Sequence, residues 1–75
     1  MIEDILKALA KGNVKLSYTS LKSGKLKEVT GTLQGDKFIT QHATSNKIIF
    51  WDTENDRWED IECNTIKTYK TMEND

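Results

Sequence analysis

The chain of 75 residues has little of what catalytic, metal and disulfide-stabilised sites are made from. It contains one cysteine, Cys63, and one histidine, His42, and the two are far apart in the sequence. A single thiol cannot form a disulfide within the chain, and it suits a reducing compartment. Because a metal site needs a convergent group of His, Cys and carboxylate ligands, this spacing predicts no metal centre.

Long hydrophobic runs are also missing. Residues 1–12 hold no continuous apolar region of the kind that a signal peptide needs, and no stretch is long enough to span a membrane as a helix. An amphipathic segment at residues 2–11 has a polar face of mixed charge, whereas membrane-surface helices are usually basic. We therefore expect a cytoplasmic protein that does not bind membranes.

Signals for catalysis are weak. His42 falls in a polar loop without a neighbouring nucleophile, and Cys63 falls on the apolar side of its predicted strand, where a thiol usually packs as a small hydrophobe. Residues 52–62 hold many carboxylates, but a pair tuned for acid–base catalysis needs burial that separates its two pKa values. The sequence predicts a protein that is not an enzyme, with no catalytic residues and no cofactor.

Charge is distributed unevenly although the net charge is only −1. Residues 1–47 have a balance of +4, and residues 48–75 have a balance of −5. Such a division favours electrostatic steering of a partner or head-to-tail association into a homo-oligomer. A monomer is the alternative, in which lysines and carboxylates are simply solvated and protect edge strands from pairing.

Hydrophobic periodicity predicts one domain, residues 1–75, with a helix at residues 2–11, a β-barrel at residues 13–70 and a tail at residues 71–75. Apolar residues first recur at helical spacing, from Ile2 to Leu9, and Gly12 is placed to end the helix. From Val14 the period changes to two. We expect strands at 14–19, 26–33, 37–40 and 68–70, a hairpin over residues 47–61, tight turns at 20–24 and 34–36, a loop at 41–46 and a helical turn at 64–67, with Asn64 as its possible cap and Ile66 buried.

The register of one hairpin follows from the sequence. With a loop at residues 53–56, in which Asn55 can take the left-handed conformation, Trp51 faces Trp58 and Ile48 faces Ile61. Directly opposed residues share a face of the sheet, so the two tryptophans lie together on the face opposite Ile48. The same register predicts an exposed ion pair between residues 52 and 57 at the end of the hairpin.

A leading helix and about five short strands predict a mainly β protein, a small SH3-like or Sm-like barrel. Gly31, inside a strand pattern, suggests a bulge or a sharp bend. The chain resembles the small WYL-like family of tailed-phage proteins, which is described as having such a barrel. The resemblance covers roughly residues 13–67, and it is carried by Val14-x-Leu16-x-Tyr18-Thr19, Lys22-Ser23-Gly24, Gly31-Thr32-Leu33, Phe50-Trp51-Asp52 and Trp58-x-x-Ile61-x-Cys63-x-x-Ile66.

The resemblance implies a virus-encoded accessory protein in the bacterial host cytoplasm, with a biochemical role that is largely unassigned. Part of the chain, including Gly31-Thr32-Leu33 and Asp36, is also similar to Sm and Hfq proteins. The asparagine that those proteins use to contact RNA bases is missing near Thr40, and no Arg-Gly pair follows the fourth predicted strand. Uridine binding of the Sm type therefore does not carry over.

Protein binding is the first functional hypothesis, with a host or viral protein as the partner. If Trp51 and Trp58 face away from the core, they form an apolar patch of the residue type most enriched in interface hot spots. If the helix covers them, they belong to the core. An acidic rim is expected around the patch, formed by Asp56, Asp60 and Glu62.

Single-stranded RNA or DNA binding is the alternative hypothesis. Small barrels bind single strands by combining a basic groove with stacking aromatic side chains. The acidic second half and the single arginine oppose this hypothesis, because nonspecific affinity depends on neutralising phosphates. The residues that would bind are Lys15, Tyr18, Lys22, Lys25, Lys27 and Lys37.

Overall fold

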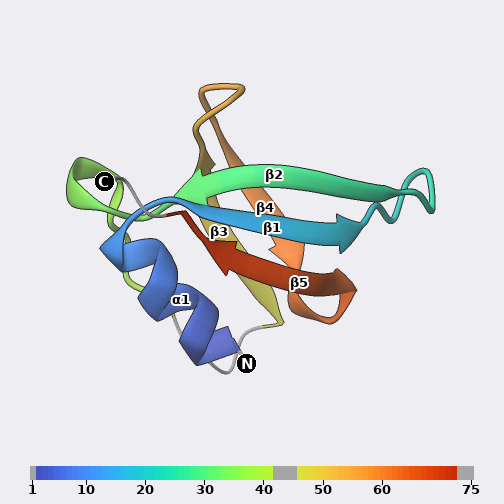
Figure 1. Ribbon diagram of the computed structural model, residues 1–75, viewed down its shortest axis with the longest axis horizontal. Helices are drawn as coiled ribbons and strands as arrows, with labels where there is room; N and C mark the ends of the chain where they lie inside the picture. The colour runs from blue at the N-terminus through green and yellow to red at the C-terminus, as the bar shows by residue number, and fades with distance from the viewer. Residues whose placement is uncertain (1, 42–45, 73–75) are drawn as a thin grey trace.

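The structure is a computed structural model, and it describes residues 2–41 and 46–72. These residues form one mainly β unit in which five antiparallel strands make a single sheet behind an N-terminal helix (Figure 1). Along the chain the elements are α1 (Ile2–Lys11), β1 (Val14–Thr19), β2 (Leu26–Thr32), a 3-10 turn η1 (Gly35–Lys37), β3 (Lys47–Asp52), β4 (Arg57–Glu62), a second 3-10 turn η2 (Cys63–Thr65) and β5 (Ile66–Thr71).

Helix α1 has the predicted bounds, and its apolar stripe packs into the core. Ile5 and Leu9 are fully buried, and the helix packs against β2 and β3. A helix of ten residues is marginal alone in water, so this packing is what stabilises it. The backbone N–H of Leu33 donates to the Leu9 carbonyl at 2.9 Å, which fastens the end of the helix to the end of β2. No helix in the described ranges has the length and apolar character to cross a membrane.

The sheet has the strand order β4-β3-β2-β1-β5 and is not closed. Strand β1 pairs along its length with both β2 and β5, and β3 pairs along its length with β4. Strand β2 joins these two halves, but it meets β3 only through Gly31 and Thr32, opposite Asp52 and Trp51. Strands β4 and β5 therefore each end the sheet with one edge that pairs with no strand among the described residues.

Gly31 is placed where the two halves of the sheet meet. Of the bulge or sharp bend predicted there, the bulge is not seen in the pairing with β1, because the register runs without a shift from Leu26 to Gly31, where this ladder ends. The irregularity lies instead between β1 and β5, at Ser17 and Tyr18. A Cβ atom at position 31 would come within 3.0 Å of three ring carbons of the Phe50 side chain. A side chain is excluded at position 31 because the buried Phe50 ring packs directly on the backbone.

The register predicted for the second hairpin is confirmed throughout. Trp51 pairs with Trp58 and Ile48 with Ile61. Ile48, Phe50 and Ile61 are buried in the core, as their common face requires. The residue in the left-handed conformation is Asp56, with φ of 52°, and not Asn55, whose side-chain amide donates to Asp52.

Three local predictions were wrong. Residues 37–40 do not form a strand, because the N–H of Phe38 donates to the Gly35 carbonyl and folds the chain into η1. The predicted helical turn is present, but it spans Cys63–Thr65 instead of residues 64–67 and its N-cap is Glu62 instead of Asn64; Ile66 is buried as predicted. Strand β5 begins at the buried Ile66 and includes Thr71, which we expected in the tail. The expected loop at residues 41–46 and the rest of the tail lie largely outside the described residues, at 42–45 and 73–75.

Candidate functional site

The two tryptophans form an aromatic pair on the face of β3 and β4 that points away from the core. Their ring centroids are 5.4 Å apart and their planes are inclined by 80°, an edge-to-face contact. The Nζ atom of Lys37 lies 3.7 Å from the Trp51 ring centroid, so a cation–π contact covers that ring. Trp58 remains 44% exposed, and Ile49, which shares the alternation of Trp51, is 40% exposed. We call this surface, made of Ile49, Trp51, Trp58 and Lys37, the tryptophan face.

Helix α1 does not cover the tryptophan face. The helix stripe packs into a core that includes Ile5, Leu9 and Phe50, and neither tryptophan belongs to that core. Trp51 is half-buried by the aromatic contact and by Lys37, which η1 carries over it. Of the two arrangements that the sequence left open, the one in which the helix buries the tryptophans is wrong.

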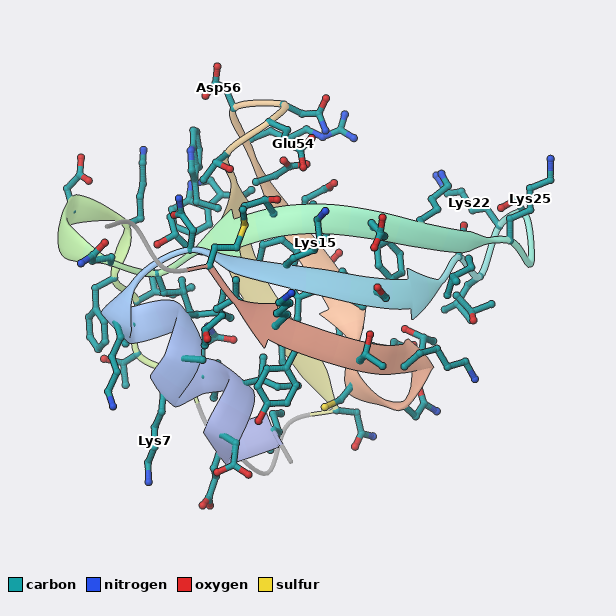
Figure 2. All side chains as sticks on the ribbon, in the orientation of Figure 1. Lys7, Lys15, Lys22, Lys25, Glu54 and Asp56 are labelled. Carbon is teal, nitrogen blue, oxygen red and sulfur yellow. The ribbon has the colours of Figure 1, made fainter. Side chains whose placement is uncertain are left out.

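The predicted acidic rim is brought together only in part. Asp60 is exposed beside the tryptophan face, opposite Ile49, and its carboxylate lies 3.8 Å from the Lys47 ammonium. Glu62 is half-buried and follows the same alternation along β4. Asp56 lies at the end of the hairpin loop, away from the strands (Figure 2). Two of the three acids therefore flank the tryptophan face along β4, and the third is at its far end.

Asp52 is the polar residue whose role the sequence did not reveal. We predicted that it forms an exposed ion pair with Arg57, but Asp52 is fully buried, and the Arg57 guanidinium lies 3.5 Å from Glu59. The Asp52 carboxylate accepts hydrogen bonds from the backbone N–H groups of Glu54 and Asn55 and from the Asn55 side chain, at 2.8–3.1 Å. Burial alone would raise the pKa of Asp52, but these hydrogen bonds and the nearby Arg57 charge leave that pKa lowered.

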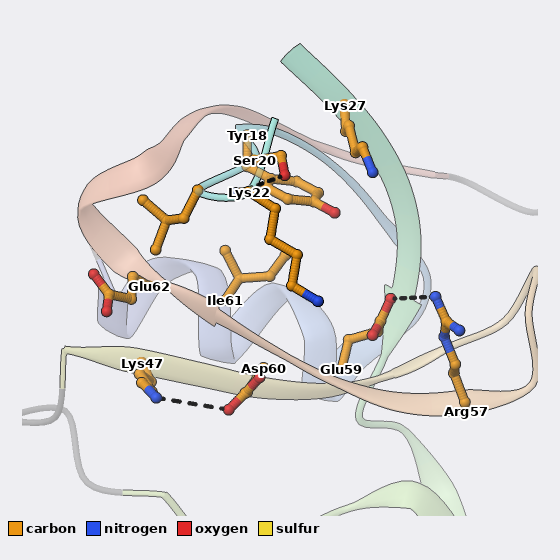
Figure 3. A pocket seen from close by; sticks show the side chains of 11 residues that line it. Tyr18, Ser20, Lys22, Lys27, Lys47, Arg57, Glu59, Asp60, Ile61 and Glu62 are labelled. Atoms are coloured by element: carbon orange, nitrogen blue, oxygen red, sulfur yellow. Dashed lines mark hydrogen bonds and ion pairs between the residues drawn. The ribbon is translucent and has the colours of Figure 1, made fainter. Parts of the chain in front are cut away.

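A cleft of about 320 Å³ separates the first hairpin from β4 (Figure 3). The side chains of Tyr18, Lys22 and Lys27 reach into it from one side, and the paired Arg57 and Glu59 lie on the other. Burial raises the pKa of the Tyr18 hydroxyl, and the negative charges of Glu59 and Asp52 raise it further. The cleft thus combines the ammonium groups of Lys22 and Lys27 with the carboxylate of Glu59. Its lining is Tyr18, Ser20, Leu21, Lys22, Lys27, Lys47, Arg57, Glu59, Asp60, Ile61 and Glu62.

The six residues proposed for nucleic-acid binding do not share one surface. Tyr18, Lys22 and Lys27 line the cleft. Lys15 points away from the core on the other face of β1, opposite Lys70 of β5, and Lys25 follows the turn at the end of the first hairpin. Lys37 lies on the tryptophan face. We predicted one surface because these residues lie close together in the sequence. In the structure, the alternation of side chains along β1 and the turn η1 place them on different surfaces.

A second hollow, of about 250 Å³, lies between α1 and the segment that follows η1. It is mostly apolar, and Phe38 at its border is 60% exposed. This hollow was not predicted, because the sequence pattern indicated a strand at residues 37–40. Its lining is Leu6, Lys7, Ala10, Leu33, Phe38, Ile39, Thr40 and Gln41.

Groups for metal binding do not come together in the described part of the chain, where no three His, Cys, Asp or Glu side chains are placed to hold an ion. Cys63 is half-buried against the core, and His42 lies outside the described residues. No family model, curated protein or solved structure matches this chain.

Proposed function

We propose that this chain is a small protein-binding module that contacts a partner through the tryptophan face. The observation that carries this proposal is the Trp51–Trp58 pair, which lies outside the core with Trp58 44% exposed. Exposed tryptophan beside other apolar side chains is typical of interface hot spots. Ile49 extends the apolar surface, and the flanking acids Asp60 and Glu62 would form part of its polar rim.

Rigidity of the aromatic pair supports the same conclusion. Trp51 is held between the edge contact with Trp58 and the Lys37 ammonium. Both tryptophans also stand on directly paired strands of one hairpin. A surface that is already ordered loses less side-chain entropy when a partner binds, so more of its contact energy appears as affinity.

The wider setting is part of the proposal. We propose a non-enzymatic accessory or regulatory protein of the WYL-like phage type, acting on a host or viral protein in the bacterial host cytoplasm. We also propose that the open sheet is a variant of the SH3-like or Sm-like barrel. The strand order β4-β3-β2-β1-β5 with a leading helix supports this view.

A comparative capture experiment tests the tryptophan face. Wild type, Trp58→Ala and Leu26→Ala are immobilised and exposed to bacterial lysate, and the retained proteins are quantified by mass spectrometry. Leu26 is a matched control because it is 65% exposed on the other hairpin. We expect wild type and Leu26→Ala to retain the same protein and Trp58→Ala to lose it. If a folded Trp58→Ala variant retains the same proteins, the tryptophan face is not the binding site.

Single-stranded nucleic acid is a second candidate ligand, favoured by the presence of Tyr18, Lys22 and Lys27 in one cleft. A stacking aromatic ring beside two cations suits a nucleotide, although the carboxylates of the same cleft would repel phosphates. Labelled RNA and DNA are titrated at low and moderate salt with wild type, a Lys22→Ala/Lys27→Ala variant and a Lys15→Ala/Lys25→Ala control. Absence of binding at low salt excludes this candidate, because low salt favours phosphate contacts most.

A further inference from the structure

The outer edge of β4 presents backbone groups that no strand uses in the described residues. The hydrogen bond from the N–H of Cys63 to the Asn46 carbonyl, at 2.6 Å, shows which alternate residues of β4 bond to β3. In an antiparallel ladder alternate residues bond to the partner strand, so Glu59 and Ile61 bond to β3. Trp58 and Asp60 then direct their N–H and C=O groups away from β3, to the end of the sheet.

Other contacts agree with this alternation of hydrogen-bonded residues. Gln41 binds the backbone of Ile49 on the side of β3 that faces away from β4, with its side chain accepting from the N–H at 2.8 Å and donating to the carbonyl at 2.7 Å. Ile49 is opposite Asp60, so these two residues point in opposite directions across the hairpin. At the far end of β4, Thr65 Oγ1 donates to the Glu62 carbonyl at 2.7 Å. The open part of the edge is therefore Trp58 and Asp60.

Charges on the two sides of this edge differ. On the face that points away from the core, Asp60 and Glu62 follow Trp58 along β4, and the Lys47 ammonium lies 3.8 Å from the Asp60 carboxylate. On the core-facing side, the cleft holds the Arg57–Glu59 ion pair together with the ammonium groups of Lys22 and Lys27, neither of which makes an ion pair within the described residues (Figure 3). A strand laid along the edge would direct alternate side chains to these two sides, so each side would select a different charge.

We propose that an extended segment of the partner protein adds to β4 as a further antiparallel strand, with basic side chains toward Asp60 and Glu62 and acidic side chains toward Lys22 and Lys27. This inference rests on the proposed protein-binding function and adds the chemistry of the segment that is bound. Backbone hydrogen bonds to Trp58 and Asp60 provide the affinity, and the alternating charges determine which segment fits. The Trp58 side chain, on the outer side of the same strand, contacts the basic or apolar side chains of the segment.

The geometry of a β-ladder predicts which residues of a bound peptide form hydrogen bonds with β4, and this prediction can be tested. In an antiparallel pair, the residues that bond to each other are directly opposed and share a face of the sheet, so the peptide residues that bond to Trp58 and Asp60 direct their side chains to the face of these two residues. In an alternating Glu-Lys peptide those residues are the lysines. N-methylation of the lysine nitrogens therefore removes the N–H groups that face β4, whereas N-methylation of the glutamate nitrogens removes only N–H groups that face away.

The probes are four synthetic eight-residue peptides: alternating Glu-Lys, a block peptide of the same composition, and the two N-methylated forms of the alternating peptide. Each is titrated into the ¹⁵N-labelled full chain. We expect the alternating peptide to shift the amide signals of β4 and the cleft and to slow hydrogen exchange at Trp58 and Asp60. N-methylation of lysine removes at least two backbone hydrogen bonds and is expected to weaken binding by about fivefold to a hundredfold. N-methylation of glutamate leaves binding close to that of the parent peptide.

Two variants of one residue provide the matched control on the protein side. Asp60→Ala removes a carboxylate but keeps the edge N–H, whereas Asp60→Pro removes both and is compatible with an edge strand. We expect Asp60→Pro to lose peptide binding and Asp60→Ala to weaken it only severalfold. No binding of the alternating peptide, equal effects of the two N-methylated forms, or equal effects of the two variants would each overturn the inference.

The second possible occupant of this edge is another copy of the chain. Light scattering and hydrogen exchange across a range of protein and salt concentrations distinguish it. Concentration-dependent protection at Trp58 and Asp60 without peptide would overturn the inference in favour of self-association. In lysate, an Asp60→Pro variant that still retains the protein lost by Trp58→Ala would overturn edge pairing and leave the tryptophan face standing.

Discussion

The two hairpins end in loops of similar polarity that are held in different ways. The loop between β3 and β4 closes on Asp52, a fully buried carboxylate that accepts hydrogen bonds from Glu54 and Asn55. The turn between β1 and β2 closes on Ser20, whose exposed hydroxyl accepts from two backbone N–H groups at 3.3 and 3.4 Å. Since a buried charged acceptor forms stronger hydrogen bonds than an exposed hydroxyl, the second hairpin has the more strongly held loop.

The two hairpin loops also differ in how they are attached to the rest of the sheet. The loop after β3 is fastened to β2, because Thr53 donates to the Thr30 carbonyl at 3.0 Å and the Thr30 N–H donates to the Glu54 carboxylate at 3.2 Å. The turn after β1 extends away from the sheet (Figure 1), and its Leu21 side chain is 73% exposed. The tryptophan face is thus built on the rigid hairpin, whereas one wall of the cleft comes from the looser one.

Asp52→Ala should have the largest effect on this comparison. The substitution leaves the backbone N–H groups of Glu54 and Asn55 and the Asn55 amide without their acceptor. Removal of a buried, charged hydrogen-bond acceptor is expected to lower the free energy of unfolding by about 3 kcal/mol. Urea denaturation measures the loss. Asp60→Ala, an exposed acid of the same hairpin, is the control and should change stability by less than about 0.5 kcal/mol. Equal small effects would show that Asp52 does not anchor the loop.

Gly31→Ala should have the next largest effect, since it disturbs the position where the two hairpins join. The added methyl group would collide with the buried Phe50 ring. Overpacking of this kind costs about 1–3 kcal/mol. In a thermodynamic cycle, Gly31→Ala should be less harmful in a Phe50→Leu background, because the smaller side chain leaves space. Strict additivity of the two substitutions would mean that the glycine is needed for another reason.

Helices, strands and their register were easier to predict from the sequence than the buried contacts that hold the loops. Helix α1 and the pairing of Trp51 with Trp58 were predictable because they depend on periodicity within a short stretch. The burial of Asp52 was not predictable, because it depends on the pairing of β3 with β2 and on the side chain of Asn55. An Asp at the start of a turn can accept a hydrogen bond from the backbone two residues on, and this is the local signal that could have indicated the role of Asp52.

Residues of the candidate site show the same limit. The exposure of Trp58 depends on where α1 packs, and helix periodicity describes only which side of the helix is apolar, not what it covers. Lys37 reaches Trp51 because η1 replaces the expected strand, a change that depends on the positive φ of Gly35. Local sequence patterns therefore could not predict these contacts between distant segments.

Acid should weaken the rigid hairpin more than the loose one. The pKa of Asp52 is lowered in the folded protein, so the unfolded chain takes up this proton first as the pH falls. The stabilisation from Asp52 is present above the unfolded pKa of about 4 and is lost as the pH falls below it. Urea denaturation between pH 7 and pH 2 should show a smaller loss of stability for Asp52→Asn than for wild type. Parallel curves would mean that the pKa of Asp52 is not lowered by folding.

Ser20→Ala should have the smallest effect, and it tests whether the looser turn depends on its hydroxyl at all. The Ser20 side chain accepts from the N–H groups of Lys22 and Ser23 at long distances, and both donors are exposed to water that can replace it. The turn keeps its backbone hydrogen bonds between Ser20 and the residues Gly24 and Lys25. We expect a loss of about 0.5 kcal/mol or less in the free energy of unfolding. Hydrogen exchange at Gly24 provides a local readout, since its N–H donates to the Ser20 carbonyl. A loss as large as that of Asp52→Ala would show that the two hairpins are anchored equally.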